Sequence, residues 1–254
     1  MLTSTFIHVP GVGATTEKRL WQNGIRTWAD ALAASPSDLP LTAAQRSFFR
    51  PTIEASACAL EQGDYAYFGR MLPGGDQWRA APEFMDRVGF LDIETNGGNR
   101  PEDITVVGVY DGDESHLYVK YRDLDRFAED AGGYALFVTY YGGGFDIPFL
   151  RRRFPDLPFD QLHIDLCPAL RRLGYKGGLK AVETRIGIRR TPEVDGLNGW
   201  DAVQLWRAWR RRGDEDALKL LLDYNRADIE NLSLLLAFAY GRLKAATGFP
   251  PAGK

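Results

Sequence analysis

The stretch Arg87-Val-Gly-Phe-Leu-Asp-Ile-Glu-Thr95 decides the fold of the longer part of this chain. Its apolar, strand-forming residues end in two acids, which predicts a buried strand with carboxylates near its carboxyl end. Because side chains alternate along a strand, Asp92 and Glu94 should share a face, with Cα atoms roughly 6.5 Å apart. Carboxylates that close repel each other unless they are protonated, paired with cations or bound to a metal. No lysine or arginine lies between Arg87 and Arg100, which favours a metal, although acids that merely face water are the simpler alternative.

The composition is that of a globular protein with a sizeable core. The 254 residues are 44% hydrophobic and 12% aromatic, enough for one large or two unequal domains. The net charge of −3 argues against a general polyanion-binding protein. Arginine clusters can still form local basic patches, and they lie at 151–153, 171–172, 189–190 and 210–212. Two cysteines without Cys-X-X-Cys spacing and the lack of a leader or an apolar run of about 20 residues predict a cytoplasmic protein without a membrane segment.

Breaks in the pattern divide the chain. Residues 1–62 are predicted to form a small all-helical domain. Glycines and prolines in residues 63–82 indicate a linker, whose aromatic residues should hold it against one or both domains. An α/β domain is expected over residues 83–245, followed by a tail at 246–254.

The first domain contains a glycine turn, Pro10-Gly11-Val12-Gly13, before a helix-like run at 14–23. Two glycines flanking an apolar residue permit a tight turn whose N–H groups, at a helix start, can bind phosphate. Lys18 would add a further contact. This stretch resembles a helix-hairpin-helix motif, which in its families holds nucleic-acid backbone without reading sequence. The residues equally allow a glycine turn that only packs two helices.

The second domain begins with a meander. The strands 104–110 and 116–119 flank Asp111-Gly112-Asp113, a hairpin signal, so the first three strands should be antiparallel. A helix at 124–131 and a strand at 134–140 follow, an alternation that adds a parallel strand. A further strand is expected at 161–164, a helix at 179–186, and helical runs at 202–209, 218–222 and 224–240.

Asp146 follows a glycine-rich turn. The run Gly142–Gly144 lets the chain leave its strand sharply, and Pro148 suits the first turn of a helix. Aspartate is a preferred helix N-cap, so the residues alone favour a cap over a ligand for Asp146. Asp165, at the end of the next strand, is likewise predicted to be a cap.

Tyr224 and Asp228 lie four residues apart in the last predicted helix and therefore share a face. Their apolar neighbours indicate that much of this helix is buried, so an inward-pointing Asp228 needs a partner. The Asn231 side chain, a water molecule or a metal ion would each serve.

Three motifs in order, Asp92-Ile-Glu94, Phe145-Asp146 and Tyr224-X-X-X-Asp228, resemble the exonuclease motifs of the DEDD (DnaQ-like) superfamily in its tyrosine branch. Other stretches are similar to landmarks of the YprB-type ribonuclease H-like proteins: His163-Ile-Asp-Leu, Gly177-Gly-Leu-Lys180, Gly187-Ile-X-Arg190 and Asp201-Ala-Val. The resemblance covers roughly residues 65–240. It implies a ribonuclease H-like fold, a mixed five-stranded sheet flanked by helices.

The resemblance also implies an activity, 3′–5′ exonucleolytic hydrolysis of phosphodiester bonds with two divalent cations, Mg²⁺ or Mn²⁺. Asp92, Glu94 and Asp228 would bind the metal that activates water, Asp92 would bridge to a second metal held with Asp146, and Tyr224 would orient the water. Oxygen ligands suit these hard cations.

Substrate contacts transfer less directly. Thr95 falls where the family contacts the terminal nucleotide. Family members often carry asparagine shortly before the second motif, where this chain has Tyr141 and three glycines, so end preference does not carry over. The helix-hairpin-helix resemblance favours single-stranded DNA as the substrate. The alternatives are RNA 3′ ends, or a non-catalytic nucleic-acid-binding module on the same scaffold; protein partners and oligomeric state are not indicated.

Overall fold

The computed structural model describes residues 1–250, which divide into two compact units. The first contains residues 1–86, 160–163 and those from 240 onward, and the second contains residues 87–159 and 164–239. The last helix ends at Thr247, inside the segment 246–254 that the sequence pattern assigned to a tail. Residues 251–254 of that tail lie outside the described residues. Among the helices of the described part, none is long and apolar enough to cross a membrane.

The first unit is helical. Its helices are α1 (Ala14–Gln22), α2 (Trp28–Ala33), α3 (Ala43–Glu61) and α4 (Tyr65–Met71), with the 3₁₀ segments η1 (Leu2–Ser4) and η2 (Gly74–Glu83). Capping boxes begin α2 and α3, through Thr27 with Asp30 and Thr42 with Gln45. A buried ion pair links α1 to η2: Glu17 lies 2.8 Å from Arg79 and also accepts hydrogen bonds from Thr5 and Phe6.

The segment 63–82, expected to be a linker, forms α4 and most of η2 within the first unit. Phe68 and Trp78 are 0% and 2% exposed. Burial of these large rings stabilises the segment more than its glycines and prolines destabilise it, and a 3₁₀ helix accommodates Pro82.

The glycine turn before α1 has the backbone that only glycine adopts freely. Gly11 has a φ of +78°, and Gly13 occupies the N-cap position of α1. The carbonyl of Gly11 accepts a hydrogen bond from the Gln45 side chain at 2.7 Å. Gly11, Gly13 and Lys18 are all exposed, so this turn is accessible.

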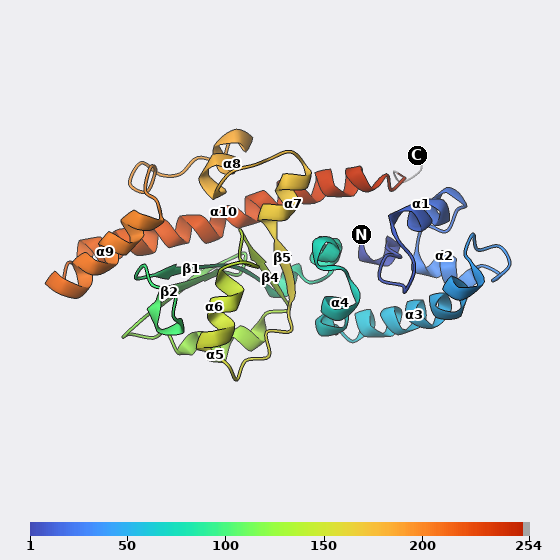
Figure 1. The fold of residues 1–254 in the computed structure, drawn as a ribbon, viewed down its shortest axis with the longest axis horizontal. Helices are drawn as coiled ribbons and strands as arrows, with labels where there is room; N and C mark the ends of the chain where they lie inside the picture. Colours follow the sequence, from blue (N-terminus) through green and yellow to red (C-terminus); the bar gives the residue numbers. More distant parts are fainter. Residues whose placement is uncertain (251–254) are drawn as a thin grey trace. The chain divides into compact units, whose positions relative to one another are not determined.

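The second unit is built on a five-stranded mixed sheet in the order β3-β2-β1-β4-β5 (Figure 1). Its strands are β1 (Val88–Thr95), β2 (Ile104–Tyr110), β3 (Ser115–Val119), β4 (Leu136–Thr139) and β5 (Leu162–Asp165). The predicted pairing is confirmed: β1 and β2 are antiparallel, β2 and β3 are antiparallel, and β4 joins β1 in parallel. The strand that carries the two acids is therefore central.

Helices cover both faces of this sheet. They are α5 (Arg126–Asp130), α6 (Asp146–Arg153), α7 (Leu166–Arg172), α8 (Leu179–Ile186), α9 (Gly199–Arg212) and α10 (Glu215–Thr247), with short 3₁₀ turns η3 (Met85–Arg87), η4 (Pro101–Asp103) and η5 (Ala131–Gly133). Figure 1 shows α5 and α6 on one side of the sheet and α10 on the other. Leu91 and Ile93 pack into the core with Phe149 of α6. Because side chains alternate along β1, Asp92 and Glu94 point to the α10 side.

The final helical runs form one helix, where the sequence pattern suggested an interruption near Asp223. Its carboxylate lies 2.8 Å from Lys219 and 3.0 Å from Arg226, one turn away on either side. These pairs keep the acid on the outer surface, so the helix continues through it.

Candidate metal centre

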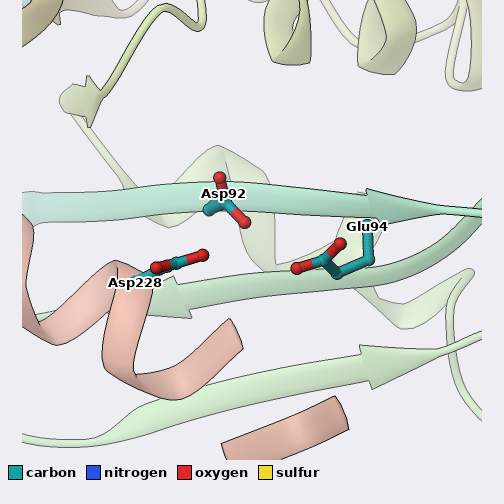
Figure 2. Close-up of side chains that lie close together, drawn as sticks. All are labelled: Asp92, Glu94 and Asp228. Carbon is teal, nitrogen blue, oxygen red and sulfur yellow. The ribbon is translucent and has the colours of Figure 1, made fainter. Parts of the chain in front are cut away.

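Three carboxylates meet above the middle of the sheet. Asp92 and Glu94 come from β1 and Asp228 comes from α10, and each offers an oxygen that lies within 4.8 Å of the others' (Figure 2). Glu94 and Asp228 are buried, 8% and 6% exposed, and Asp92 is partly buried. The predicted same-face arrangement of the two strand acids thus meets an acid 134 residues further along the chain from Glu94 (228 − 94 = 134).

Asp146 is the first residue of α6 and is not its N-cap. Phe145 occupies the cap position and makes no side-chain cap, so the cap expected for Asp146 is wrong. The buried carboxylate instead accepts a hydrogen bond at 2.9 Å from the backbone N–H of Ile93, between the two strand acids. Asp146 lines the same cleft as the other three acids, although it is not part of the tight group.

This cleft has a volume of about 440 Å³. Tyr224 lines it beside Asp228, and Thr95 lines it after the first motif, so every residue transferred from the three motifs borders one cavity. The predicted contacts Gly11, Gly13 and Lys18 belong to the first unit and do not line this cleft.

Asn225 supports Asp92 from α10. Its side-chain amide donates a hydrogen bond at 2.9 Å to Asp92, and the residue is fully buried. Gly108 of β2 pairs with Asp92 across the strands, and its missing side chain makes the room that Asn225 occupies. The sequence did not reveal this residue, since its partner is distant along the chain.

Replacing Gly108 by alanine is expected to displace Asn225, because the added Cβ would lie 1.9 Å from its side-chain oxygen. Overpacking of this kind costs about 1–3 kcal/mol, and the melting temperature should fall by about 2–12 °C at 2–4 °C per kcal/mol. Thermal unfolding followed by circular dichroism measures this. The control Gly132→Ala, where no atom lies within 4 Å of the new Cβ, should unfold like the native chain; an equal melting temperature for both variants would contradict the expectation.

Arg190 is the charged partner of Asp228. Its guanidinium forms a bidentate pair with Glu183, both bonds 2.8 Å, and lies 2.5 Å from Asp228. Asn231, one of the three candidate partners named for Asp228, donates to Glu183 at 3.0 Å. Arg190 thus bridges two buried carboxylates, Glu183 and Asp228.

A second cation, Lys180, reaches the site from α8. Its Nζ lies 4.5 Å from the centroid of the Tyr224 ring and is buried without a hydrogen-bond partner among residues 1–250. Burial lowers the pKa of this lysine. The sequence near Asp92 contains no cation, but the fold brings Arg190 and Lys180 to the site. These two cations are fewer than the four acids.

Asp165 holds the glycine loop that precedes Asp146. It caps α7 through the Cys167 N–H, as predicted, and also accepts hydrogen bonds from Tyr141 at 2.8 Å and Gly143 at 3.1 Å. Tyr141 has a φ of +67°, a strained conformation for a bulky residue. The loop is thereby fixed at the edge of the cleft.

The electrostatics of the cluster favour added protons or cations. Burial, and then the neighbouring acids, raises the pKa of Asp92 and of Glu94 well above their usual range. Burial also raises the pKa of Asp228, against the opposing effect of Arg190, and raises the pKa of Asp146 to about 7. The four carboxylates are held where a positive charge would stabilise their ionised forms.

The metal-free protein should gain stability at neutral pH when Asp146 is replaced by asparagine. Folding raises the pKa of the Asp146 carboxyl from 3.8 to about 7. The stability that Asp146 contributes in its protonated form is therefore fully present below about pH 4 and is lost as the pH rises through about 7. Asparagine keeps the acceptor for Ile93 without the charge. In EDTA at pH 7.5 the variant should melt at least about 2–4 °C higher, the equivalent of about 1 kcal/mol, with no difference at pH 4. The exposed control Asp156→Asn should show no pH-dependent gain, and a lower melting temperature for Asp146→Asn at pH 7.5 would refute the expectation.

The residues present fit a divalent metal. The donors are carboxylate oxygens, the ligands that Mg²⁺ and Mn²⁺ prefer. Burial and the neighbouring acids raise the pKa of Asp92 and of Glu94, so a bound cation would stabilise the ionised form of both. Thiolate and imidazole ligands are lacking from the group, which disfavours zinc.

Comparison with known proteins gives one family. Residues 89–240 match the RNase_H_2 family model, described as RNase_H superfamily. The search of curated proteins found no match. The matched segment contains all four acids and Tyr224, and such nucleases act on nucleic acids with divalent metals. The match reaches the superfamily alone, so the tyrosine branch, the YprB type and the helix-hairpin-helix resemblance stay predictions.

Proposed function

This chain belongs to the ribonuclease H superfamily, and on that premise we propose that it is a metal-dependent 3′–5′ exonuclease acting on single-stranded DNA. The observation that carries the proposal is the convergence of Asp92, Glu94, Asp146 and Asp228 with Tyr224 on one open cleft. Superfamily membership supports hydrolysis of phosphodiester bonds. The motif order supports the exonuclease branch.

Each residue has a role that its surroundings support. Asp92, Glu94 and Asp228 would hold one cation and Asp92 with Asp146 a second. Bound divalent cations supply a polarised phosphodiester oxygen and a water that ionises near neutral pH. Burial raises the pKa of Tyr224, which keeps its hydroxyl protonated at neutral pH. Tyr224 can therefore orient a water as a hydrogen-bond donor.

Labelled oligonucleotides test the direction of cleavage. With Mg²⁺ or Mn²⁺, a 5′-labelled single strand should shorten in a ladder, while a 3′-labelled strand should release labelled mononucleotide from the start. EDTA should abolish both reactions. Internal fragments without a ladder would indicate an endonuclease, and preferential shortening of an RNA strand of the same sequence would reassign the substrate.

The accessible turn at Gly11 and Gly13 is proposed to hold the DNA backbone, with Lys18 beside it. Gly13→Glu adds a negative charge where no atom lies within 4 Å of the new Cβ, so the fold should tolerate it. We expect DNA binding to weaken while turnover at saturating substrate is unchanged. Fluorescence anisotropy of a labelled oligonucleotide measures the binding. An unchanged dissociation constant would mean that the turn only packs helices together and does not bind DNA.

A non-catalytic nucleic-acid-binding module is the second candidate. The ion pair between Arg190 and Asp228 favours it, because it neutralises one carboxylate without a metal. Salt-sensitive DNA binding without metal-dependent cleavage would support this candidate over the nuclease.

A further inference from the structure

Exposed aromatic rings gather around the carboxylates. In the described part of the chain, large apolar side chains that are exposed are Phe48, Met85, Tyr121, Tyr141, Phe145, Trp200 and Leu234. Tyr141, Phe145 and Trp200, at 56%, 38% and 61% exposure, all line the cleft of the metal centre. Exposed rings concentrated in one cleft indicate a binding surface for a partner with flat apolar faces.

Two of these rings come from the glycine loop and are held in place. The N–H of Tyr141 is bonded to Asp165, and the Tyr141 ring lies so close to Gly144 that a Cβ there would be 3.1 Å from it. The Phe145 ring packs against that of Phe149 with centroids 4.8 Å apart. Their position is therefore fixed before any ligand binds.

The third ring stands at the start of α9, in the same unit. The Asn198 side chain accepts a hydrogen bond from the backbone N–H of Trp200 at 2.8 Å, which fixes the first turn of α9. Seven residues on, Arg207 shares the face of Trp200 and places its guanidinium 5.3 Å from the centroid of the Trp200 ring. Arg210, one turn further, lies 4.2 Å from the centroid of the exposed Tyr121 ring. This face of α9 thus leads away from the cleft with alternating aromatic and cationic groups.

We propose that an unpaired DNA strand occupies this surface, with its terminal bases stacked among Tyr141, Phe145 and Trp200 and its phosphates contacting Arg207 and Arg210. The inference rests on the proposed function, since it names the side chains that would hold the single strand proposed there. Every base has a flat face, so stacking on aromatic side chains binds single strands without regard to sequence. Bases in a duplex are stacked on one another and do not offer those faces. The cleft volume of about 440 Å³ is in the range for one drug-sized ligand, which is the size of a nucleotide.

Trp200 also provides the readout. It is 61% exposed, whereas Trp21, Trp28, Trp78 and Trp206 are each at most 5% exposed and Trp209 is partly buried. Titration of the intact chain with oligo(dT), in EDTA so that nothing is cleaved, should quench tryptophan fluorescence, and Trp200→Phe should remove most of that quenching while retaining binding. Blunt duplex DNA of the same length should compete at least about tenfold more weakly than oligo(dT).

Two variants separate stacking from charge. Trp200→Ala should weaken oligo(dT) binding by about fivefold or more, with an unchanged dependence of the dissociation constant on salt. Arg207→Gln should lower the slope of log K against log salt by about 0.7, the value for one phosphate contact on a single strand. Arg212→Gln, on the opposite side of α9 from Arg210, is the matched control and should change neither quantity.

The outcomes distinguish this inference from the nuclease proposal. Metal-dependent cleavage together with an unchanged dissociation constant for Trp200→Ala would overturn the stacking surface and leave the nuclease intact. Trp200-dependent binding of oligo(dT) without any cleavage in Mn²⁺ would support the surface and refute the nuclease. Binding of oligo(rU) but not oligo(dT), or tighter binding of duplex than single strand, would overturn the assignment to unpaired DNA.

Discussion

Replacing Asp92 by asparagine is expected to slow hydrolysis of a single-stranded oligonucleotide by at least about 10³-fold, or about 4 kcal/mol in the activation barrier. Asp92 shares its strand face with Glu94 and lies beside Asp228, which α10 supplies (Figure 2). Asparagine keeps an oxygen that Asn225 can donate to, so the fold is retained. The change removes a negative charge and a strong metal ligand, and little else.

The rate is measured as loss of full-length substrate at saturating Mn²⁺, and metal binding by isothermal titration calorimetry. Asp223→Asn is the control, because it removes the same charge from the outer surface of α10, next to Tyr224, without touching the cleft. Native-like activity of Asp92→Asn, with manganese uptake unchanged, would remove Asp92 from the catalytic machinery and the proposed mechanism with it.

The central strand and its two acids could be predicted because everything they need is local. Period-two alternation places Asp92 and Glu94 on one face whatever the rest of the chain does. The turn Asp111-Gly112-Asp113 likewise specifies the antiparallel hairpin of β2 and β3 from three residues. Motif order then indicated that Asp146 and Asp228 join them, an inference from resemblance that the cleft supports.

The surroundings of the acids could not be predicted, since they depend on tertiary contacts. Whether a carboxylate caps a helix or points into a cleft differs by a single residue of helix register, which is why the residues alone favoured an N-cap for Asp146 while the resemblance placed it among the metal ligands. Nothing in the sequence distinguishes Asn225 from other polar residues. Its role depends on Gly108, which has no side chain and so leaves room for Asn225 beside Asp92. Arg190 and Glu183 carried one available signal, the Gly187-Ile-X-Arg190 landmark, but a landmark does not reveal which acid its arginine contacts.

Arg190→Met is the second change with a large expected effect, a loss of about 3–5 kcal/mol in the free energy of unfolding. It leaves Glu183 and Asp228 buried without their cation, and removal of one partner of a buried pair costs more than removal of both. At about 2–4 °C per kcal/mol, the metal-free melting temperature should fall by about 6–20 °C. The control is Arg185→Met, which replaces an exposed arginine on α8, the helix that carries Glu183, and should unfold like the native chain.

Manganese separates a positioning role of Arg190 from a purely structural one. If the guanidinium holds Asp228 in place until a metal binds, Mn²⁺ supplies the missing positive charge and should raise the melting temperature of Arg190→Met more than that of the native chain. A guanidinium that served Glu183 alone would give equal increments in both. Should the single variant fail to fold, the double variant Glu183→Gln, Arg190→Met removes one charge of each sign and keeps Asp228 as the only acid that has lost its partner. Equal manganese increments in that variant and the native chain would exclude any influence of Arg190 on the metal centre.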